Sequence, residues 1–236
     1  MLISVVICAY NEEKRIGKSI EAIQEQDFPK EDFEIVVVNN ASTDQTAELA
    51  KSYGVRVVYE KEKGIAHARQ KGSEEARGEI IAFTDADTHV PNHWLKTIAQ
   101  AFQKDEKLVG FGGVFRINSG SFMSRLVINH GEYPLYLLAK IITGKWLLVG
   151  NNMAYKKSAF EKTGGYNTNL SQGEDTDISQ KLNKVGKVKL INNFYVYQSG
   201  RRFEQGLIRG LASYGWNWPL KVFFNIDTAK RLPDFR

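Results

Sequence analysis

A chain of 236 residues, 42% hydrophobic and 25% charged, has the composition of an ordinary globular protein with one large domain or two small ones. Its formal net charge of +5 suits an anionic partner, such as a nucleotide, a lipid phosphate or a membrane surface, without choosing among them. The single cysteine, Cys8, excludes an intrachain disulfide and predicts a buried, inert thiol in a reducing cytoplasm. No segment has the roughly 18 uninterrupted apolar residues of a spanning helix, and we expect no signal peptide.

The first half of the chain alternates strand and helix patterns. Short β-branched apolar runs predict buried strands over 3–10, 33–40, 55–60 and 79–87. Between and after them, helical spacing and capping residues predict helices over 12–26, 42–54, 64–78 and 91–105, the last beginning at Pro91. This alternation predicts an α/β fold with a parallel sheet covered by helices on both faces.

The second half is less regular. A strand is predicted over 108–117, and a helical segment over 125–145 with a break near Pro134. Residues 150–186 predict a strand, a helix, and a loop leading into another helix, and residues 187–200 one or two final strands. No linker or repeat divides the chain, so we expect one compact domain over 1–236 with two functional halves.

Polar clusters follow three of the predicted strands. They are "AYNEE" after the first strand, "NNASTD" after the second and "TDADT" after the fourth. Because ligands of such sheets bind outside the carboxyl ends of the strands, we expect these clusters to converge on one crevice.

Two carboxylates, Asp85 and Asp87, end the strand "EIIAFTDAD" with only Ala86 between them. Such a pair repels unless a cation is present, and Mg²⁺ or Mn²⁺ commonly binds one or two carboxylates plus substrate phosphates. Two alternatives use the same residues. The pair could be a solvated turn in which Asp87 or Thr88 caps the next helix. It could also be the D-x-D-x-T/V pattern of a phosphatase, which His89 and the position after the fourth strand disfavour.

Three other clusters each allow a structural and a chemical interpretation. "GEDTD" contains Glu174, Asp175 and Asp177, which favour a helix start but also supply a candidate general base. "NNASTD" caps a helix, while its Asn39 and Asn40 carry donors and acceptors suited to a nucleobase edge. "SGRR" offers adjacent guanidiniums, either a surface pair or a diphosphate site.

In their order along the chain, these clusters resemble the motifs of family 2 glycosyltransferases, which have the GT-A fold. The resemblance extends from Ile3 to about Arg202 and is carried by "SVVICAYNEE", "EIVVVNNASTDQT", "GIAHARQKGSEEARGEIIAFTDADT", "GNNMAYKKSAFEKTGGYNTNLSQGEDTDISQKL" and "SGRR". It implies a Rossmann-like, mainly parallel sheet flanked by helices, with a mixed acceptor-side half. It also implies an inverting transfer of a sugar from a UDP- or GDP-linked donor.

The resemblance assigns roles residue by residue. Asp175 occupies the catalytic-base position with Glu174 beside it, and Asp87 should bind Mn²⁺ or Mg²⁺ directly. The other residues should bind the nucleotide sugar, and they are Ala9, Tyr10, Glu12, Asn39 or Asn40, Arg69 or Lys71, Asp85, Ala86, Arg201 and Arg202. Two departures stand out, because Asn replaces the usual Asp at the base position, and Gln198 stands where many GT-A enzymes have a metal-binding His.

The resemblance also divides the chain into a nucleotide-sugar half over 1–115 and an acceptor half over 116–236. Segments 122–146 and 203–224 mix aromatic with basic residues. They either fill the core between the halves or attach the protein to the inner face of the cell membrane, beside a glycan or lipid-linked acceptor. We expect no nucleic-acid partner. A non-enzymatic nucleotide-sugar-binding protein on the same fold is the second hypothesis, and the phosphatase is the third.

Overall fold

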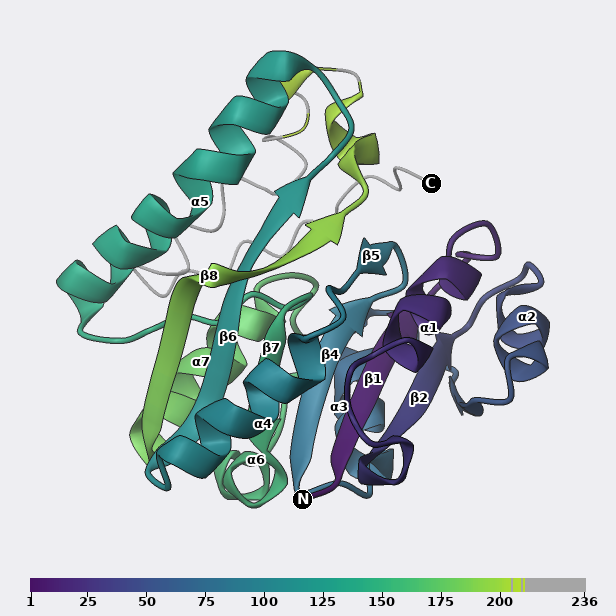
Figure 1. The fold of residues 1–236 in the computed structure, drawn as a ribbon, viewed down its shortest axis with the longest axis horizontal. Helices are drawn as coiled ribbons and strands as arrows, with labels where there is room; N and C mark the ends of the chain where they lie inside the picture. Colours follow the sequence, from purple (N-terminus) through teal and green to yellow (C-terminus); the bar gives the residue numbers. More distant parts are fainter. Residues whose placement is uncertain (205, 209, 211–236) are drawn as a thin grey trace.

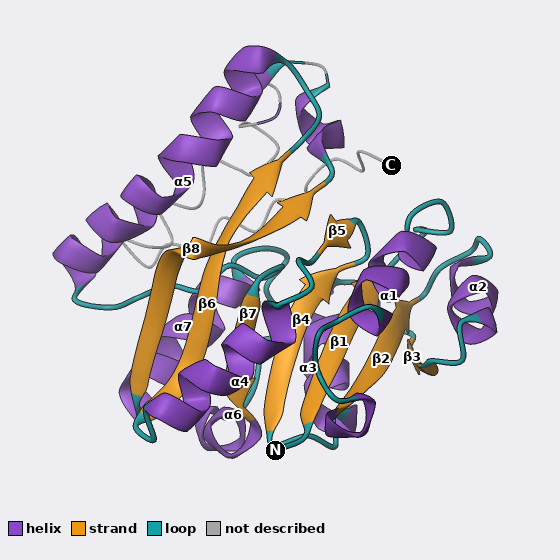
Figure 2. Ribbon diagram, viewed as in Figure 1, coloured by secondary structure: helices purple, strands orange, loops and turns teal. Residues whose placement is uncertain are grey.

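The structure is a computed structural model that describes residues 1–204, 206–208 and 210. One eight-stranded sheet runs through it, in the order β3-β2-β1-β4-β7-β6-β8-β5 (Figure 2). Most of the expected basic and aromatic tail, from residue 211 onward, lies outside the described residues.

The first part of the sheet is parallel, as predicted. It consists of β1 (Ile3–Ala9), β2 (Phe33–Asn40), β3 (Arg56–Glu60) and β4 (Ile80–Asp85). The side chains of β1 and β2 are almost all buried, as expected for strands covered on both faces.

The second part of the sheet is mixed. β7 (Met153–Lys156) runs antiparallel to both β4 and β6 (Leu108–Ile117), while β8 (Lys187–Gln198) runs parallel to β6. The two-residue β5 (Thr88–His89) follows β4 directly and pairs antiparallel with the end of β8. This last pairing joins residues 88–89 to residues 197–198.

Helices cover both faces of the sheet (Figure 1). α1 (Ile16–Gln24) and α4 (Trp94–Lys104) lie on one face, and α3 (Ile65–Glu75) and α7 (Glu174–Val185) on the other. The remaining helices are α2 (Thr46–Ser52), α5 (Phe122–Thr143) and α6 (Lys157–Thr163), with short 3-10 helices at Lys30–Asp32 and Gly200–Phe203.

Two predicted helix features were wrong. α4 begins at Trp94 and not at Pro91, because a turn comes first, in which the Trp94 N–H donates to the Pro91 carbonyl over 2.9 Å. α5 is not broken near Pro134 but continues through it. The side chain of Asn129, one turn before the proline, holds α5 to β6 through hydrogen bonds of 2.8 and 3.1 Å to the backbone of Ile117. This anchoring offsets the hydrogen bond that the proline cannot make.

The register between β6 and β8 shifts between Gly113 and Val114, which face Ile191 and Tyr195 respectively. A Cβ atom at Gly113 would lie 1.6 Å from the carbonyl oxygen of Phe194, so only glycine allows the two backbones to approach so closely. The buried side chain of Asn152 secures this point by donating to the carbonyls of Val114 and Phe194, at 2.9 and 3.0 Å. Beyond the shift, β8 reaches the crevice edge at Gln198.

Candidate active site

The carboxyl ends of β1, β2 and β4 place three predicted site residues side by side. In the sheet register, Ala9 pairs with Asn39, and Cys8 pairs with Asp85. The predicted convergence of the polar clusters at this edge is therefore present in the structure. Cys8 is half-buried and not fully buried as predicted, and burial raises the pKa of its thiol to about 12.

The β5–β8 pairing brings Asp87 to the segment that follows β8. The Asp87 carbonyl accepts from the Ser199 N–H over 3.1 Å, and its carboxylate lies 3.0 Å from the Arg201 guanidinium. Gln198 also donates to the Asp87 carboxylate, over 3.5 Å. Thr88 lies in β5 and does not start a helix, so the structure does not support the alternative of a helix-capping turn.

Arg201 binds two carboxylates at once. Besides Asp87, it donates to both carboxylate oxygens of the buried Glu12, over 2.7 and 3.2 Å. Burial raises the pKa of Asp87 to about 6, and the charge of Asp85 adds to this effect while Arg201 opposes it. The side chains of Glu12, Asp87 and Arg201 are together called the Arg201 cluster below.

A second cation, the buried Arg69 of α3, holds the other carboxylates. Arg69 donates to Glu174 at the start of α7 and lies 3.5 Å from the Asp85 carboxylate. Although burial opposes it, the charges of Glu174 and Asp85 raise the pKa of Arg69, so the guanidinium stays charged. Burial raises the pKa of Glu174 to about 7, against the opposing charge of Arg69. Asp85, Arg69 and Glu174 form the Arg69 cluster.

Gly150 makes room for the Arg69 guanidinium. A Cβ atom at this glycine would lie 2.2–2.5 Å from the guanidinium atoms. The N–H of the same glycine points to the Asp175 carboxylate, at 3.3 Å. Asp175 therefore lies at the first turn of α7, next to the Arg69 cluster.

Asp175 and Asp177 differ in their surroundings. The Asp177 carboxylate pairs with Lys181 one helical turn later, at 2.8 Å. Asp175 instead accepts from the backbone N–H groups of Gly150 and Thr176, over 3.3 and 2.7 Å. Of the two carboxylates, Asp175 is the one in contact with the loop that surrounds Arg69.

The two adjacent asparagines also differ. The Asn40 side chain donates to the carbonyls of Glu60 and Glu62, at 3.3 and 2.7 Å, and accepts from the Gly64 N–H at 2.8 Å. It therefore holds the loop between β3 and α3. The Oδ1 atom of Asn39 is buried and has no hydrogen-bond partner. Asn39 is the one with an acceptor left for a ligand.

Of the other predicted residues, Tyr10 and Arg202 adjoin the strand ends, while Lys71 lies elsewhere on α3. Tyr10 follows β1, and its ring and hydroxyl contact the Lys63 ammonium, which lies 4.0 Å from the ring centroid. Arg202 follows Arg201, and its charge lowers the pKa of Asp87. Lys71 pairs with Glu75 at 2.9 Å in an ion-pair network with Arg56, so the structure does not bring it to the crevice.

Two further polar side chains, the buried Asn151 and the half-buried Glu132, were not predicted as site residues. Asn151 donates to Gln198 over 3.0 Å, and its own Oδ1 atom is buried without a partner. Glu132, the only acid between residues 122 and 145, accepts from the Phe115 N–H over 2.8 Å. Burial raises the Glu132 pKa well above its usual value, and the charge of Asp175 adds to it. In the sequence, the only sign of Glu132 is that it is the single acid in a helical segment of mainly apolar and basic residues.

The carboxylates fit the expected Mn²⁺ or Mg²⁺ in their chemistry. Within residues 1–204, 206–208 and 210, no three His, Cys, Asp or Glu side chains form a group that could hold a metal ion. Mg²⁺ is commonly held by one or two carboxylates together with substrate phosphates, and Asp85 and Asp87 supply that number of carboxylates.

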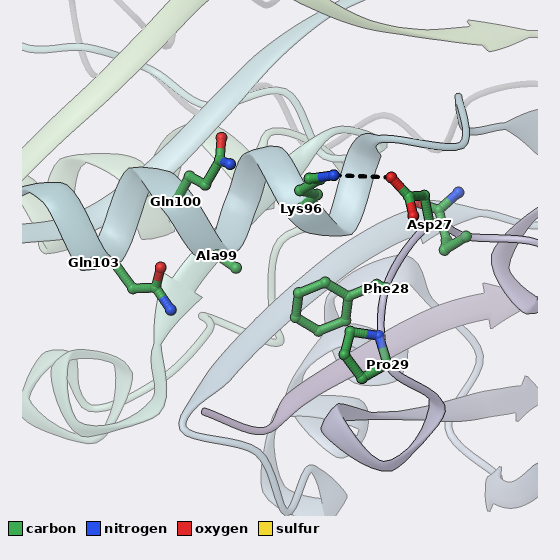
Figure 3. A pocket seen from close by; sticks show the side chains of 8 residues that line it. Asp27, Phe28, Pro29, Lys96, Ala99, Gln100 and Gln103 are labelled. Atoms are coloured by element: carbon green, nitrogen blue, oxygen red, sulfur yellow. Dashed lines mark hydrogen bonds and ion pairs between the residues drawn. The ribbon is translucent and has the colours of Figure 1, made fainter.

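A pocket lies away from this crevice, between residues 26–29 and α4 (Figure 3). Its charged side chains are Lys96 and Asp27, which form an ion pair of 2.9 Å with each other. None of the predicted site residues lines this pocket.

Solved structures with the same arrangement of strands and helices are glycosyltransferases. Mannosyltransferase PcManGT from Pyrobaculum calidifontis, solved with GDP-Man and Mn²⁺, superposes with a TM-score of 0.70 at 22% identity over 97% of this chain and 65% of that chain. TarS 1–349 from Staphylococcus aureus gives a TM-score of 0.68 at 18% identity over 94% of this chain and 75% of that one. The fold is therefore the GT-A glycosyltransferase fold.

The sequence comparison is more specific. The model of "Glycosyl transferase family 2" matches residues 4–164, and the chain belongs to this family. This membership replaces the phosphatase alternative for Asp85 and Asp87.

Curated relatives carry glycosyltransferase names. "Probable glycosyltransferase YdaM" from Bacillus subtilis is 28% identical over 78% of this chain, and "Glycosyltransferase AglE" from Haloferax volcanii is 25% identical over 78% of it. The matches span 47% of the first relative and 62% of the second. The chain therefore corresponds to about half of the length of these proteins.

Proposed function

We propose that the protein is an inverting glycosyltransferase that moves a sugar from a UDP- or GDP-linked donor to a hydroxyl or phosphate acceptor, in glycan or cell-envelope synthesis. The observation that carries the proposal is the convergence of the Arg201 and Arg69 clusters at the carboxyl ends of β1, β2 and β4. Family membership supports it.

The donor half of the proposal uses the strand ends. Asn39 accepts a hydrogen bond from the base through its unpartnered Oδ1 atom. Asp85 contacts the ribose or the metal region, and Arg201 and Arg202 approach the diphosphate. A Mn²⁺ or Mg²⁺ ion, held by Asp87 together with the diphosphate, would stabilise the charge that develops on the leaving nucleoside diphosphate.

The acceptor half uses the start of α7. Asp175 takes a proton from the acceptor hydroxyl as that oxygen attacks the anomeric carbon, so in-line attack inverts the anomeric centre. Glu174 is held against Arg69 and positions the first turn of α7. In this assignment residues 1–115 form the nucleotide-sugar half and residues 116–236 the acceptor half, which also supplies Arg201 and Arg202 to the diphosphate. We place the protein in the cytoplasm, at the inner face of the cell membrane.

A thermal-shift screen tests the proposal. UDP-, GDP- and dTDP-sugars are each added with Mn²⁺, Mg²⁺ or EDTA to the wild type and to Asp87→Ala. A ligand that binds the native state raises the melting temperature, so we expect a metal-dependent shift with one nucleotide that Asp87→Ala loses.

Two outcomes would contradict the proposal in different ways. No shift with any donor, or a shift indifferent to metal and to Asp87, would remove the donor site. A normal shift without sugar transfer to any acceptor fraction would favour the non-enzymatic nucleotide-sugar-binding protein.

A further inference from the structure

The outward face of α5 carries most of the exposed large hydrophobic side chains of the described residues. Six apolar side chains are the most exposed, namely Phe122, Met123, Leu126, Leu138, Ile141 and Ile142, with Ile141 at 72% and Phe122 at 69%. Contiguous exposed apolar side chains on a protein surface often mark an interaction site. Figure 1 shows α5 along the outer edge of the molecule, on the side opposite α1 and α2.

The inward face of α5 is anchored to β6 near its middle, and further along the helix it packs Ala139 against Leu147. Asn129 bonds to both backbone groups of Ile117, Glu132 accepts from the Phe115 N–H, and Ile128 and Ala139 are buried. The helix is therefore fixed on one side and apolar on the other, and the exposed side is not needed for its own packing.

The charges around this face favour an anionic surface. Arg125, Lys140 and Lys145 are the basic residues of the segment from 122 to 145, and Glu132, its only acid, is turned toward β6. A second copy of the chain would bring these like charges together, whereas anionic headgroups would neutralise them. The half-buried Tyr133 and Trp146, stacked at 6.1 Å, are residue types that favour the headgroup level.

α5 is suited to lie on a bilayer and not to cross it. None of the helices described, α5 included, is long and apolar enough to cross a membrane. A helix with one apolar face and basic residues beside it typically lies in the interface plane.

We infer that the outward face of α5 binds the surface of an anionic lipid bilayer, and that this presents the Asp175 side of the crevice to an acceptor anchored in that bilayer. The surface itself is independent of the donor chemistry, and only the statement about the acceptor rests on the proposed function. The link between the two is the segment that follows α5. It runs from Trp146, which stacks on Tyr133 of α5, to Gly150, whose N–H contacts the Asp175 carboxylate at 3.3 Å.

Co-sedimentation of the full chain with vesicles tests the surface. We use phosphatidylcholine alone and phosphatidylcholine with phosphatidylglycerol, and compare the wild type with Ile141→Glu and Leu138→Glu. Gln100→Glu, at an exposed position of α4, is the matched control because it adds the same single negative charge away from α5.

We expect the wild type and Gln100→Glu to bind the anionic vesicles and not the neutral ones, with binding that weakens as salt is added. Each α5 variant should bind at least tenfold more weakly, and Arg125→Gln about fivefold more weakly. Circular dichroism and the melting temperature of each variant check that it is folded.

Unchanged vesicle binding in both α5 variants would overturn the inference. The inference would also be overturned if the wild type did not bind vesicles but formed a dimer that Ile141→Glu disrupts. The outward face of α5 would then bind a second copy of the chain. The donor-induced thermal shift should persist in Ile141→Glu. If the wild type shows no donor-induced shift but still binds vesicles through α5, the proposed function is contradicted and the membrane-binding role of α5 is supported.

Discussion

At the scale of single residues, the start of α7 offers a matched pair of carboxylates. Asp175→Asn should lower turnover by about 10³-fold while donor binding is retained, because a general base contributes roughly 10²–10⁴. Asp177→Asn should change turnover less than threefold, because this carboxylate is paired with Lys181 at 2.8 Å. Steady-state kinetics and donor titration on both variants make the measurement, and equal losses would reject Asp175 as the base.

A second matched pair is formed by the two asparagines that end β2. Asn40→Ala should lower the free energy of unfolding by about 2–4 kcal/mol, because it removes the three hydrogen bonds that hold the loop after β3. Asn39→Ala should stay within about 1 kcal/mol of the wild type, because its Oδ1 atom has no partner in the described chain.

Donor binding should show the opposite order for this pair. Asn39→Ala should bind the donor about tenfold more weakly, as expected for one lost hydrogen bond. Urea denaturation and donor titration separate the two effects. Normal donor binding by Asn39→Ala would assign the base contact to another residue.

At the scale of elements, the docking of α5 on β6 includes a half-buried acid. Burial raises the pKa of Glu132 in the folded state well above its usual value of 4.5. The stability that this group contributes is therefore fully present below pH 4.5 and is lost as the pH rises through the folded-state pKa. Glu132→Gln keeps an acceptor for the Phe115 N–H but cannot ionise.

The difference in unfolding free energy between Glu132→Gln and the wild type should therefore shift in favour of the variant as the pH rises from 4.5 to 9. Urea denaturation at several pH values measures it, with the exposed Glu48→Gln of α2 as the control. A difference that does not change with pH would mean that Glu132 ionises as freely as an exposed carboxylate.

Much of the elements' arrangement could be predicted from the sequence. The parallel sheet and its polar edge could be predicted from the first half of the chain. There, continuous apolar runs indicate buried strands, and helical patterns alternate with them. The continuation of α5 through Pro134 could not be predicted. The helix is held there by hydrogen bonds from Asn129 to β6, and these are tertiary contacts. The start of α4 at Trp94 could not be predicted either, because a proline such as Pro91 is compatible with both a turn and the first turn of a helix.

The candidate site was only partly predictable. The sequence predicted which carboxylates and arginines belong to the site, but it did not predict which of them pair. The pairing of β5 with β8 brings together residues about a hundred positions apart. Lys71 and Arg69 lie on one helix, and sequence alone could not tell which of them faces the crevice. Glu132 was missed because a single acid in a predicted helix matches no motif. Asn151 was missed because the Asn151–Asn152 pair does not indicate which amide faces the crevice.

At the scale of the whole molecule, Arg201 joins the first and the last parts of the described chain. Arg201→Met should lower the free energy of unfolding by about 3–5 kcal/mol at pH 7, because the buried side chains of Glu12 and Asp87 lose the cation they share and only Glu12 keeps another, Arg15 at 3.4 Å. The double variant Arg201→Met/Glu12→Gln should recover part of that loss. A loss of less than 1 kcal/mol in the single variant would show that solvent or Arg202 compensates the two carboxylates.

The Arg201 cluster also has a consequence for the order in which the protein matures during translation. Glu12 and Arg201 are 189 residues apart, so the ribosome delivers the acids of the crevice long before their cation. Until Arg201 is made, Asp87 lacks its guanidinium partner, while Glu12 has only Arg15, which lies 3.4 Å away in the folded chain. We therefore expect the complete crevice to form late in biogenesis, after nearly all of the described sequence has been made.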